Sequence, residues 1–217
     1  MRTKEHYEQL WNNERQLSWL DPTTGKRKRL LQIALRRFGG NRPDPSRALD
    51  AGCGNGAFVE FFVSLGFETY GMDLSENVAT HVRQRCPTAT IRSGSLEEPL
   101  PFPPAHFDIV WSSEVLEHLF DVQAALSEFG RVTKDGGLLI LTTPYHGLVK
   151  NALITLRGFD RHFEVTGPHL RFFSQRSLRA CLIKAGLRPL WWTGAGRCWP
   201  VYKSFFVVAR KEAIHTR

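Results

Sequence analysis

The order of apolar and polar positions predicts strands and helices that alternate between residues 47 and 144. Short apolar runs bounded by turn residues indicate strands, and longer segments with apolar residues three and four apart indicate helices. The predicted strands are RALDAG (47–52), FETYGMDL (67–74), ATIRSG (89–94), FDIVWSS (107–113) and LLILTTP (138–144). The predicted helices are GAFVEFFVSLG (56–66), SENVATHVRQRC (75–86, capped by Ser75) and DVQAALSEFGRVT (121–133), the last followed by the turn KDGG (134–137). This alternation is typical of parallel β-α-β units in a doubly wound sheet.

The two ends of the chain follow a less regular pattern. Helices are predicted over 4–20 and 26–38, and we expect residues 1–40 to form an N-terminal helical lid. After residue 144 the pattern predicts an amphipathic helix over 145–156, a polar and aromatic connection over 157–173, a helix from Ser174 to Ala185, and two antiparallel strands over 187–194 and 202–210. The expected fold is α/β, with residues 41–217 forming a doubly wound, mostly parallel, seven-stranded Rossmann-like sheet whose last strand is antiparallel.

Composition fits one compact domain in a reducing compartment. Of the 217 residues 42% are apolar, which is enough for a sizeable core. The four cysteines are scattered and form no C-x-x-C pair, which argues against a disulfide framework or a structural zinc site, and no metal is predicted. The N-terminal sequence MRTKEHYEQLW has no apolar signal segment, and no apolar run reaches membrane-spanning length. We therefore expect a cytoplasmic protein.

Charge is distributed unevenly along the chain. Residues 1–47 carry a net charge of +6, residues 48–156 a net charge of −7, and residues 157–217 a net charge of +9. Most of these charges are expected to be solvated surface. The acidic centre contains the glycine-rich segment, whereas the basic ends suit an anionic substrate or surface.

The segment LDAGCGNGAF (49–58) carries the leading candidate chemistry, because a glycine-rich turn after a strand often holds a nucleotide-like ligand. From Gly52 it satisfies the dinucleotide pattern G-x-G-x-x-A, and Asp73 follows at the end of the next strand. A phosphate-binding P-loop is excluded because no Gly-Lys-Ser/Thr follows. Asp50, at the strand end, would repel a pyrophosphate but suits a ligand with an ammonium group. Glu114, after the fourth strand, has the same preference.

The segments LDAGCGNGAFVEFF, GMDLSE, LPFPPAHFDIVWSSEVLEHL and RVTKDGGLLILTTP together resemble class I S-adenosylmethionine-dependent methyltransferases. The resemblance is to the small-molecule type, close to the ubiquinone-biosynthesis methyltransferases, and is strongest over residues 46–144. It implies an enzyme that binds S-adenosyl-L-methionine at the carboxyl ends of the strands.

The resemblance also implies which residues hold the cofactor. Asp50 would lie near the methionine ammonium group, and Asp73 would accept hydrogen bonds from the ribose hydroxyls, with helix capping as its alternative role. Ser95 stands where the family most often has an aspartate, so its contact with the adenine amine stays open. The expected cofactor-binding residues are Tyr7 and Trp11 of the N-terminal helix, Asp50, Gly52, Cys53, Gly54, Gly56, Asp73, Leu74, Ser95, Leu96, Ser113 and Glu114.

Methyl transfer requires an aligned nucleophile and the exclusion of water, and a base only where the nucleophile must lose a proton. His118, on the short helix after the fourth strand, and His146, after the fifth, are the candidate catalytic bases. The basic and aromatic insertion over about 145–173 is expected to roof the substrate pocket. Its candidate substrate-binding residues are Tyr145, His146, Arg161, His162 and His169. A structural role for His118 and a solvated loop for His169 are the alternatives.

The predicted function is methyl transfer to a small-molecule acceptor, with a hydroxyl oxygen as the leading choice by family analogy. An anionic or polyhydroxylated acceptor suits the basic insertion. N- or C-methylation of a metabolite or of a lipid- or sugar-linked acceptor, methylation of tRNA or rRNA, and a binding role without activity are the alternatives. Nucleic acid is disfavoured because SSEV follows the fourth strand in place of Asn/Asp-Pro-Pro-Tyr/Phe. Contact with a membrane surface and the oligomeric state stay open.

Overall fold

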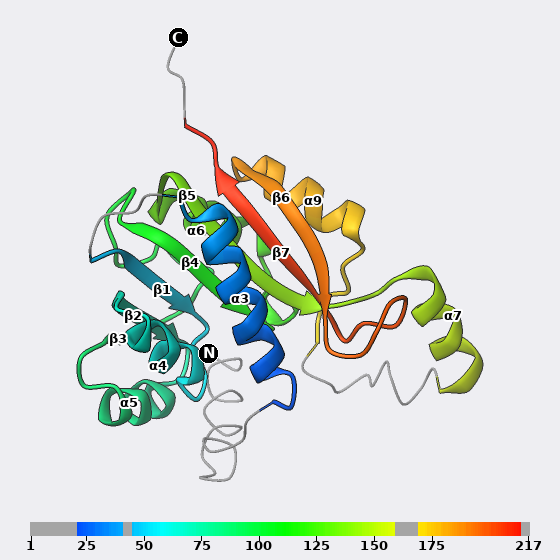
Figure 1. The fold of residues 1–217 in the computed structure, drawn as a ribbon, viewed down its shortest axis with the longest axis horizontal. Helices are drawn as coiled ribbons and strands as arrows, with labels where there is room; N and C mark the ends of the chain where they lie inside the picture. Colours follow the sequence, from blue (N-terminus) through cyan, green and yellow to red (C-terminus); the bar gives the residue numbers. More distant parts are fainter. Residues whose placement is uncertain (1–20, 41–44, 159–168, 214–217) are drawn as a thin grey trace.

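The computed structural model describes residues 21–40, 45–158 and 169–213, which form one seven-stranded sheet covered by helices (Figure 1). The strand order is β3-β2-β1-β4-β5-β7-β6. Strands β1 to β5 pair in parallel, and β7 is antiparallel to both β5 and β6. The strands are β1 (Arg47–Ala51), β2 (Glu68–Asp73), β3 (Thr90–Ser93), β4 (Phe107–Ser113), β5 (Thr133–Pro144), β6 (Leu187–Ala195) and β7 (Ser204–Lys211). This topology confirms the predicted fold class, including the antiparallel last strand.

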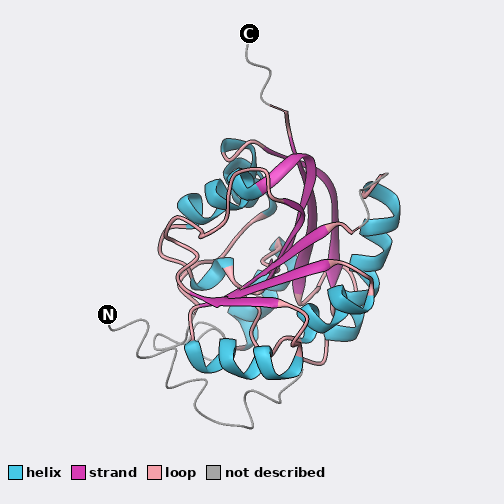
Figure 2. Cartoon of the chain, turned by 90° about the vertical axis from the view of Figure 1, so that its left-hand side faces the viewer, coloured by secondary structure: helices cyan, strands magenta, loops and turns pink. Residues whose placement is uncertain are grey.

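Helices lie on both faces of the sheet, as the edge-on view in Figure 2 shows. Helices α3 and α4 share one apolar cluster on one face, and α6 and α9 share another on the opposite face. The helices are α3 (Thr24–Phe38), α4 (Ala57–Ser64), α5 (Glu76–Arg85), η1 (Leu116–His118, a 3₁₀ turn), α6 (Val122–Val132), α7 (Leu148–Arg157) and α9 (Gln175–Lys184).

Strand β4 explains why the sheet is buried on both faces. Its residues Ile109 and Trp111 belong to the apolar cluster beneath α3 and α4, whereas Val110 belongs to the cluster beneath α6 and α9. All three side chains are fully buried. Successive side chains of a strand point to opposite faces, so an uninterrupted apolar run is what a central parallel strand requires.

Most predicted boundaries agree with the structure to within a few residues. Ser75 caps α5 by accepting a hydrogen bond from the Val78 backbone N–H, and Ser174 caps α9 by accepting one from Ser177. The predicted helix over 145–156 begins at Leu148, directly after Gly147. The predicted helix over 4–20 lies outside the described residues, and the predicted lid, residues 1–40, is described only through α3 and its flanks.

The segment KDGG (134–137), predicted as a turn before the fifth strand, is part of β5 in the structure. Strand β5 already begins at Thr133, which pairs with Phe107, and the pairing then jumps to Leu138 opposite Ile109. Residues 134–137 therefore form an irregularity within β5 and not a separate turn before it. Gly136 has φ +76° there, a left-handed conformation that glycine adopts without strain.

Candidate active site

The carboxyl ends of β1, β2 and β4 and the loop after β3 surround a cavity of about 350 Å³. Parallel sheets place their binding sites at this edge. Ten of the predicted cofactor-binding residues line the cavity: Asp50, Gly52, Cys53, Gly54, Asp73, Leu74, Ser95, Leu96, Ser113 and Glu114. Gly56 is not among the lining residues, and Tyr7 and Trp11 lie outside the described residues.

The glycine loop approaches its neighbours too closely for a side chain at Gly52. Gly52 has φ +87°, and a Cβ atom there would lie 2.3 Å from Val115 Cγ2. Its backbone N–H donates a hydrogen bond of 2.8 Å to the Met72 carbonyl of β2. Gly56, with φ +81°, is the residue before α4, and a Cβ atom there would lie 3.0 Å from the Val82 side chain. Gly52 therefore shapes the cavity wall, while Gly56 allows α4 to pack against α5.

Asp50 is a buried carboxylate with an unused acceptor. It is 2% exposed, and its Oδ2 accepts no hydrogen bond from the described residues. Burial raises the pKa of Asp50 well above its usual range, the negative charge of Asp73 raises it further, and Arg27 lowers it. A cation in the cavity would stabilise the ionised form, because an opposite charge offsets desolvation.

Asp73 organises the glycine loop. Its Oδ2 accepts a hydrogen bond of 2.9 Å from the Gly54 N–H, and its Oδ1 accepts one of 3.2 Å from the Ser75 N–H. The cap of α5 is Ser75, so Asp73 does not serve as that cap. A carboxylate has about four acceptor positions, so these two bonds do not use all of them.

Arg27 of α3 is a cavity residue that the sequence analysis missed. It is 5% exposed, donates a hydrogen bond of 2.6 Å to Ser113 Oγ, and lies 3.3 Å from Asp21 Oδ1. Burial raises the pKa of Asp21, but hydrogen bonds from Lys203 and Thr23 together with the Arg27 charge lower it to about 2. The signal was present in the helical spacing, because Arg27 falls on the same face as the buried Leu31 and Ala34.

The turn after β4 places Glu114 against β7. Glu114 has φ +56°, an uncommon conformation for this residue type. Its backbone N–H donates to the Thr142 carbonyl at 2.9 Å, and its Oε2 accepts a hydrogen bond of 3.0 Å from Ser204 Oγ. Its Oε1 is buried and accepts no hydrogen bond from the described residues. Glu114, which lines the cavity, thus carries a second buried carboxylate oxygen that no described residue bonds.

Glu97 is another lining residue that the sequence analysis did not name. Its two carboxylate oxygens accept hydrogen bonds of 3.0 Å from the backbone N–H groups of Phe120 and Asp121. The neighbouring Ser95 accepts a hydrogen bond of 3.1 Å from the Glu97 N–H. Both residues therefore stabilise the loop after β3, and Glu97 also ties that loop to the segment after η1.

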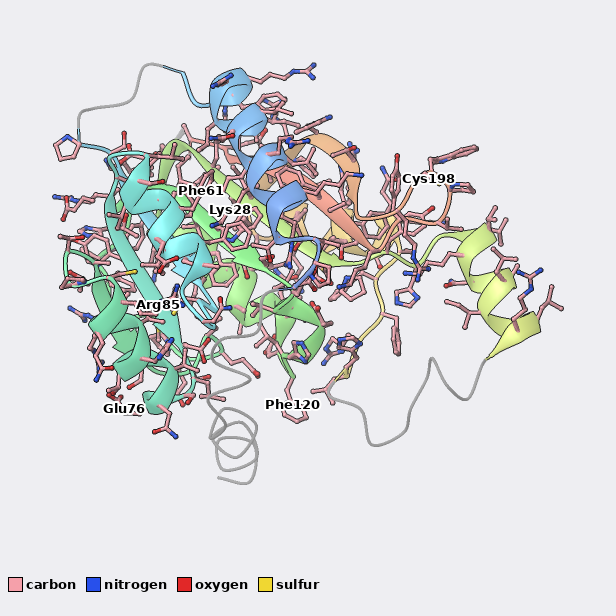
Figure 3. The ribbon with its side chains drawn as sticks, turned by 60° about the horizontal axis from the view of Figure 1, so that its bottom comes forward. Lys28, Phe61, Glu76, Arg85, Phe120 and Cys198 are labelled. Atoms are coloured by element: carbon pink, nitrogen blue, oxygen red, sulfur yellow. The ribbon has the colours of Figure 1, made fainter. Side chains whose placement is uncertain are left out.

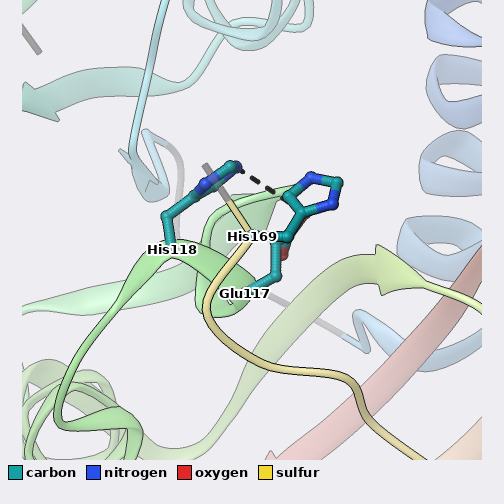
Figure 4. Close-up of side chains that lie close together, drawn as sticks. All are labelled: Glu117, His118 and His169. Carbon is teal, nitrogen blue, oxygen red and sulfur yellow. Dashed lines mark ion pairs between the residues drawn. The ribbon is translucent and has the colours of Figure 1, made fainter. Parts of the chain in front are cut away.

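Glu117, His118 and His169 form a cluster beside the cavity (Figure 4). Glu117 Oε1 lies 4.0 Å from His118 Nε2, and the rings of His118 and His169 are 5.0 Å apart. Their donor atoms lie within 4.8 Å of one another, so these three residues could hold a metal ion, although none is predicted. The Leu170 N–H donates to the Glu117 carbonyl at 2.8 Å, which brings the His169 segment to η1.

Glu117 is fully buried. Burial raises its pKa to about 8, with a further contribution from the charge of Glu114. Its Oε2 accepts a hydrogen bond of 3.0 Å from Thr143 Oγ1. The sequence analysis did not single out Glu117. Of the three residues in the cluster, His118 is the one that lines the cavity.

The other predicted catalytic and substrate residues lie apart from this cluster. His146 is 9% exposed, its Nδ1 is 3.1 Å from Asn151 Oδ1, and its ring contacts Phe172. Tyr145 packs its ring against Tyr202 and Phe205. Neither lines the cavity formed by the described residues. Arg161 and His162 lie outside the described residues.

The charge of the cavity suits a cationic ligand. Five carboxylates line it, and Arg27 supplies the opposing guanidinium; the acidic residues are Asp21, Asp50, Asp73, Glu97 and Glu114. S-adenosylmethionine carries a sulfonium and an ammonium group, one carboxylate and no phosphate, so a cavity with five carboxylates and one guanidinium fits it. A pyrophosphate would face strong repulsion at the same place.

The strand order, the antiparallel β7 and the cavity together define the class I methyltransferase fold. A family model described as "Methyltransferase domain" matches residues 24–190, so the chain belongs to this methyltransferase family. The resemblance noted from the sequence motifs is thereby confirmed, together with S-adenosylmethionine as the cofactor and an enzyme class of methyltransferase.

Three relatives illustrate the match. The chain is 40% identical over 96 residues to a Mycolicibacterium smegmatis protein named "Probable S-adenosylmethionine-dependent methyltransferase", covering 44% of this chain and 37% of that protein. It is 28% identical over 159 residues to the ubiquinone biosynthesis O-methyltransferase of Methylococcus capsulatus, covering 71% of this chain and 64% of that one. The structure of geranyl diphosphate C-methyltransferase from Streptomyces coelicolor shares the fold with a TM-score of 0.68 at 16% identity, covering 97% of this chain and 98% of that one.

The chain spans less than half the length of the mycobacterial relatives it matches, 37% and 47% of two of them. Their full activities therefore do not transfer directly to this chain. None of the helices in the described part of the chain is long and apolar enough to cross a membrane.

Proposed function

We propose that this protein transfers the methyl group of S-adenosylmethionine to a hydroxyl oxygen of a small-molecule acceptor. The observation that carries the proposal is the position of His118, an imidazole on the cavity wall beside Glu117 and His169. A hydroxyl must lose its proton during transfer, and an imidazole at neutral pH is suited to accept it. The name of the Methylococcus capsulatus relative, an O-methyltransferase, supports the same acceptor atom.

When bound, S-adenosylmethionine supplies a methyl group already activated on a sulfonium. The chain's own residues bind and orient it. Asp50 accepts a hydrogen bond from the ammonium group through its unused Oδ2, and Asp73 accepts from the ribose hydroxyls while it holds the Gly54 N–H. Arg27, buried near Asp50 on the cavity wall, would balance the carboxylate of the methionine part. The buried walls exclude water from the reacting atoms.

The acceptor would enter beside His118. The imidazole of His118 takes the hydroxyl proton as the oxygen attacks, and His169 with its exposed ring can pass that proton to solvent. Tyr145, His146, Arg161 and His162 belong to the proposed roof of the acceptor site, an assignment that rests on their place after β5. A small anionic or polyhydroxylated acceptor is proposed from the basic character of residues 157–217.

The proposal is tested in two steps. Calorimetry with S-adenosylmethionine and with NAD should show binding of the first ligand alone, and Asp50→Asn should weaken it while Glu98→Gln, an exposed acid nearby, should not. A panel of phenols, catechols and hydroxy acids is then incubated with methyl-labelled cofactor. Label recovered as an O-methyl group supports the proposal, and label recovered on nitrogen or carbon contradicts it.

The contribution of His118 has its own measurement. His118→Asn should lower kcat on the accepted substrate by about 100-fold or more, the usual size of a general-base effect, and should leave cofactor affinity within a few-fold. The pH dependence of kcat should lose its acidic limb in the same variant. An unchanged pH profile would remove His118 from the proposed mechanism.

A further inference from the structure

Helix α7 presents its apolar face to solvent. Leu148 is 87% exposed and Leu156 is 80% exposed, and Val149 and Leu153 on the same side are also exposed. These positions are one, four and three residues apart, which places them on one stripe of the helix. A surface helix of a globular domain normally turns such a stripe toward the core, whereas α7 turns its apolar face toward solvent.

The inverted orientation is fixed by polar contacts on the inner side of the helix. Lys150 is 9% exposed, and its Nζ donates hydrogen bonds to the Tyr145 carbonyl at 2.7 Å and the Lys203 carbonyl at 3.3 Å. Asn151 lies 3.1 Å from His146 Nδ1. A rotation of α7 that buried its leucines would break these bonds and expose the Lys150 amine, so the apolar stripe is held outward.

A further exposed apolar side chain, outside α7, lies at the same end of the molecule. Trp199, in the connection between β6 and β7, is 74% exposed. Figure 1 shows α7 projecting from the sheet next to this connection, and Figure 3 shows Cys198 of the connection at the same end as α7. The hydrogen bond from Lys150 to Lys203 joins the two segments. We call the exposed residues Leu148, Val149, Leu153, Leu156 and Trp199 the apolar rim.

The two segments that carry the apolar rim are basic. Residues 145–158 and 196–203 contain Lys150, Arg157, Arg197 and Lys203 and no acidic residue. Lys150 is buried and Lys203 pairs with Asp21 at 2.5 Å, so Arg157 and Arg197 supply the charge that a ligand could meet. Arg157 and Arg197 are exposed beside the rim. Exposed leucines, an exposed tryptophan and flanking arginines are the combination that binds the interface of a bilayer with anionic headgroups. A protein partner would match the apolar stripe equally well, but the two exposed arginines beside it favour an anionic lipid surface.

We propose that the apolar rim docks this protein on a membrane surface rich in anionic phospholipid. The leucines of α7 and Trp199 enter the boundary between headgroups and acyl chains, and Arg157 and Arg197 pair with lipid phosphates. The inference does not rest on the acceptor or on the chemistry of the cavity. Helix α7 follows the end of β5, and the connection with Trp199 follows the end of β6. Both strands end at the edge of the sheet that also holds the cavity. Docking would therefore turn the cavity edge toward the lipid surface.

The test is sedimentation of the full chain with vesicles. Vesicles with equal amounts of phosphatidylglycerol and phosphatidylcholine should carry the protein down, and phosphatidylcholine vesicles should carry down at least tenfold less. The double variant Leu148→Glu with Leu156→Glu should reduce binding to the mixed vesicles by at least tenfold. The matched control is Ile183→Glu, which places the same charge on an exposed position of α9 and should bind as the unchanged protein does.

Fluorescence gives a second readout at the rim itself. Mixed vesicles should shift tryptophan emission to shorter wavelength, and Trp199→Phe should abolish the shift. Calorimetry with S-adenosylmethionine checks that each variant is folded. The proposal is overturned if the mixed vesicles carry down no protein, or if Ile183→Glu lowers binding as much as the double variant. It is also overturned if the protein dimerises without vesicles and the double variant is monomeric, because the rim then binds a second copy.

Discussion

Arg27 Nη1 donates a hydrogen bond of 2.6 Å to Ser113 Oγ, and this bond joins helix α3 to the end of strand β4 across 86 positions of sequence. Ser113 Oγ in turn lies 2.8 Å from Thr142 Oγ1 at the end of β5. The guanidinium also lies 3.3 Å from Asp21. One side chain therefore connects α3 with the cavity wall and supplies a positive charge among the cavity carboxylates.

Replacing Arg27 by methionine should weaken both folding and cofactor binding. The change removes the cation near Asp50 and one of the two cations beside Asp21, whose other partner is Lys203. Removal of one partner of a buried ion pair costs about 3–5 kcal/mol. Denaturant unfolding should show that loss, and calorimetry should show at least a tenfold weaker affinity for S-adenosylmethionine. Arg29→Met, an exposed position on the same helix, serves as the control and should change neither. Equal effects at both positions would contradict the special role of Arg27.

Asp50→Asn should have opposite effects on stability and on binding. Burial raises the pKa of Asp50, so the neutral amide removes a desolvated charge, and the unliganded protein should be at least as stable as before. The affinity for S-adenosylmethionine should fall by roughly 10- to 100-fold, the loss expected when a charged hydrogen bond is removed. Thermal unfolding with and without the cofactor measures both effects. A variant with weaker folding and unchanged affinity would contradict the assigned contact.

Gly52→Ala should destabilise the fold through two separable causes. The new Cβ would lie 2.3 Å from Val115 Cγ2, and φ +87° is strained for alanine. Together these effects should cost about 2–4 kcal/mol in the free energy of unfolding. Gly66→Ala is the matched control, because Gly66 has φ +81° and no atom within 4 Å of a new Cβ. Its cost should be the backbone strain alone.

The steric part of the Gly52 effect is tested by a double-mutant cycle with Val115→Ala. Removal of the valine methyl groups relieves the contact, so the two changes together should cost less than the sum of the separate changes. We expect a coupling energy of about 1–3 kcal/mol from denaturant unfolding. Additive costs would show that the backbone conformation alone makes Gly52 necessary.

Glu117 should make the stability of the protein depend on pH between about 4.5 and 8. Its folded-state pKa is raised from 4.5 to about 8, so the folded protein holds a proton there that the unfolded chain releases. This contribution is complete below pH 4.5 and is lost as pH rises through 8. Glu117→Gln should flatten the profile between pH 4.5 and 8, by an amount on the order of a few kcal/mol over that window. Unfolding free energies measured from pH 5 to pH 9 compare the two proteins, and parallel profiles would contradict the assignment.

The sheet was predictable because each strand is identified by the pattern of its own short segment of sequence. The continuous apolar runs at 107–113 and 138–144 identify central strands, and the glycine spacing from Gly52 identifies the turn that follows β1. Asp50 and Asp73 were singled out because they stand at the ends of predicted strands, and Glu114 because it directly follows one, where a parallel sheet places its site. All three line the cavity.

The remaining features depend on contacts that the sequence pattern does not encode. The helical spacing of Arg27, in the charged run GKRKR, puts it on the buried face of its helix, but only the fold shows that its guanidinium meets the end of β4. The pattern of α7 identifies an apolar stripe, but its direction is decided by the bonds of Lys150 to carbonyls on two separate segments. Residues 134–137 read as a turn because of their glycines, yet pairing with β4 begins before them at Thr133.

The hydrogen bonds that Asp73 accepts from Gly54 and Ser75 fix the glycine loop in one conformation through contacts within the chain itself. If Asp73 accepts the ribose hydroxyls as proposed, the ordering of this segment is completed during folding and does not reduce the affinity. Part of the folding free energy of the chain would then serve recognition of the cofactor, because a ligand could be aligned against a fixed carboxylate without rearranging the loop.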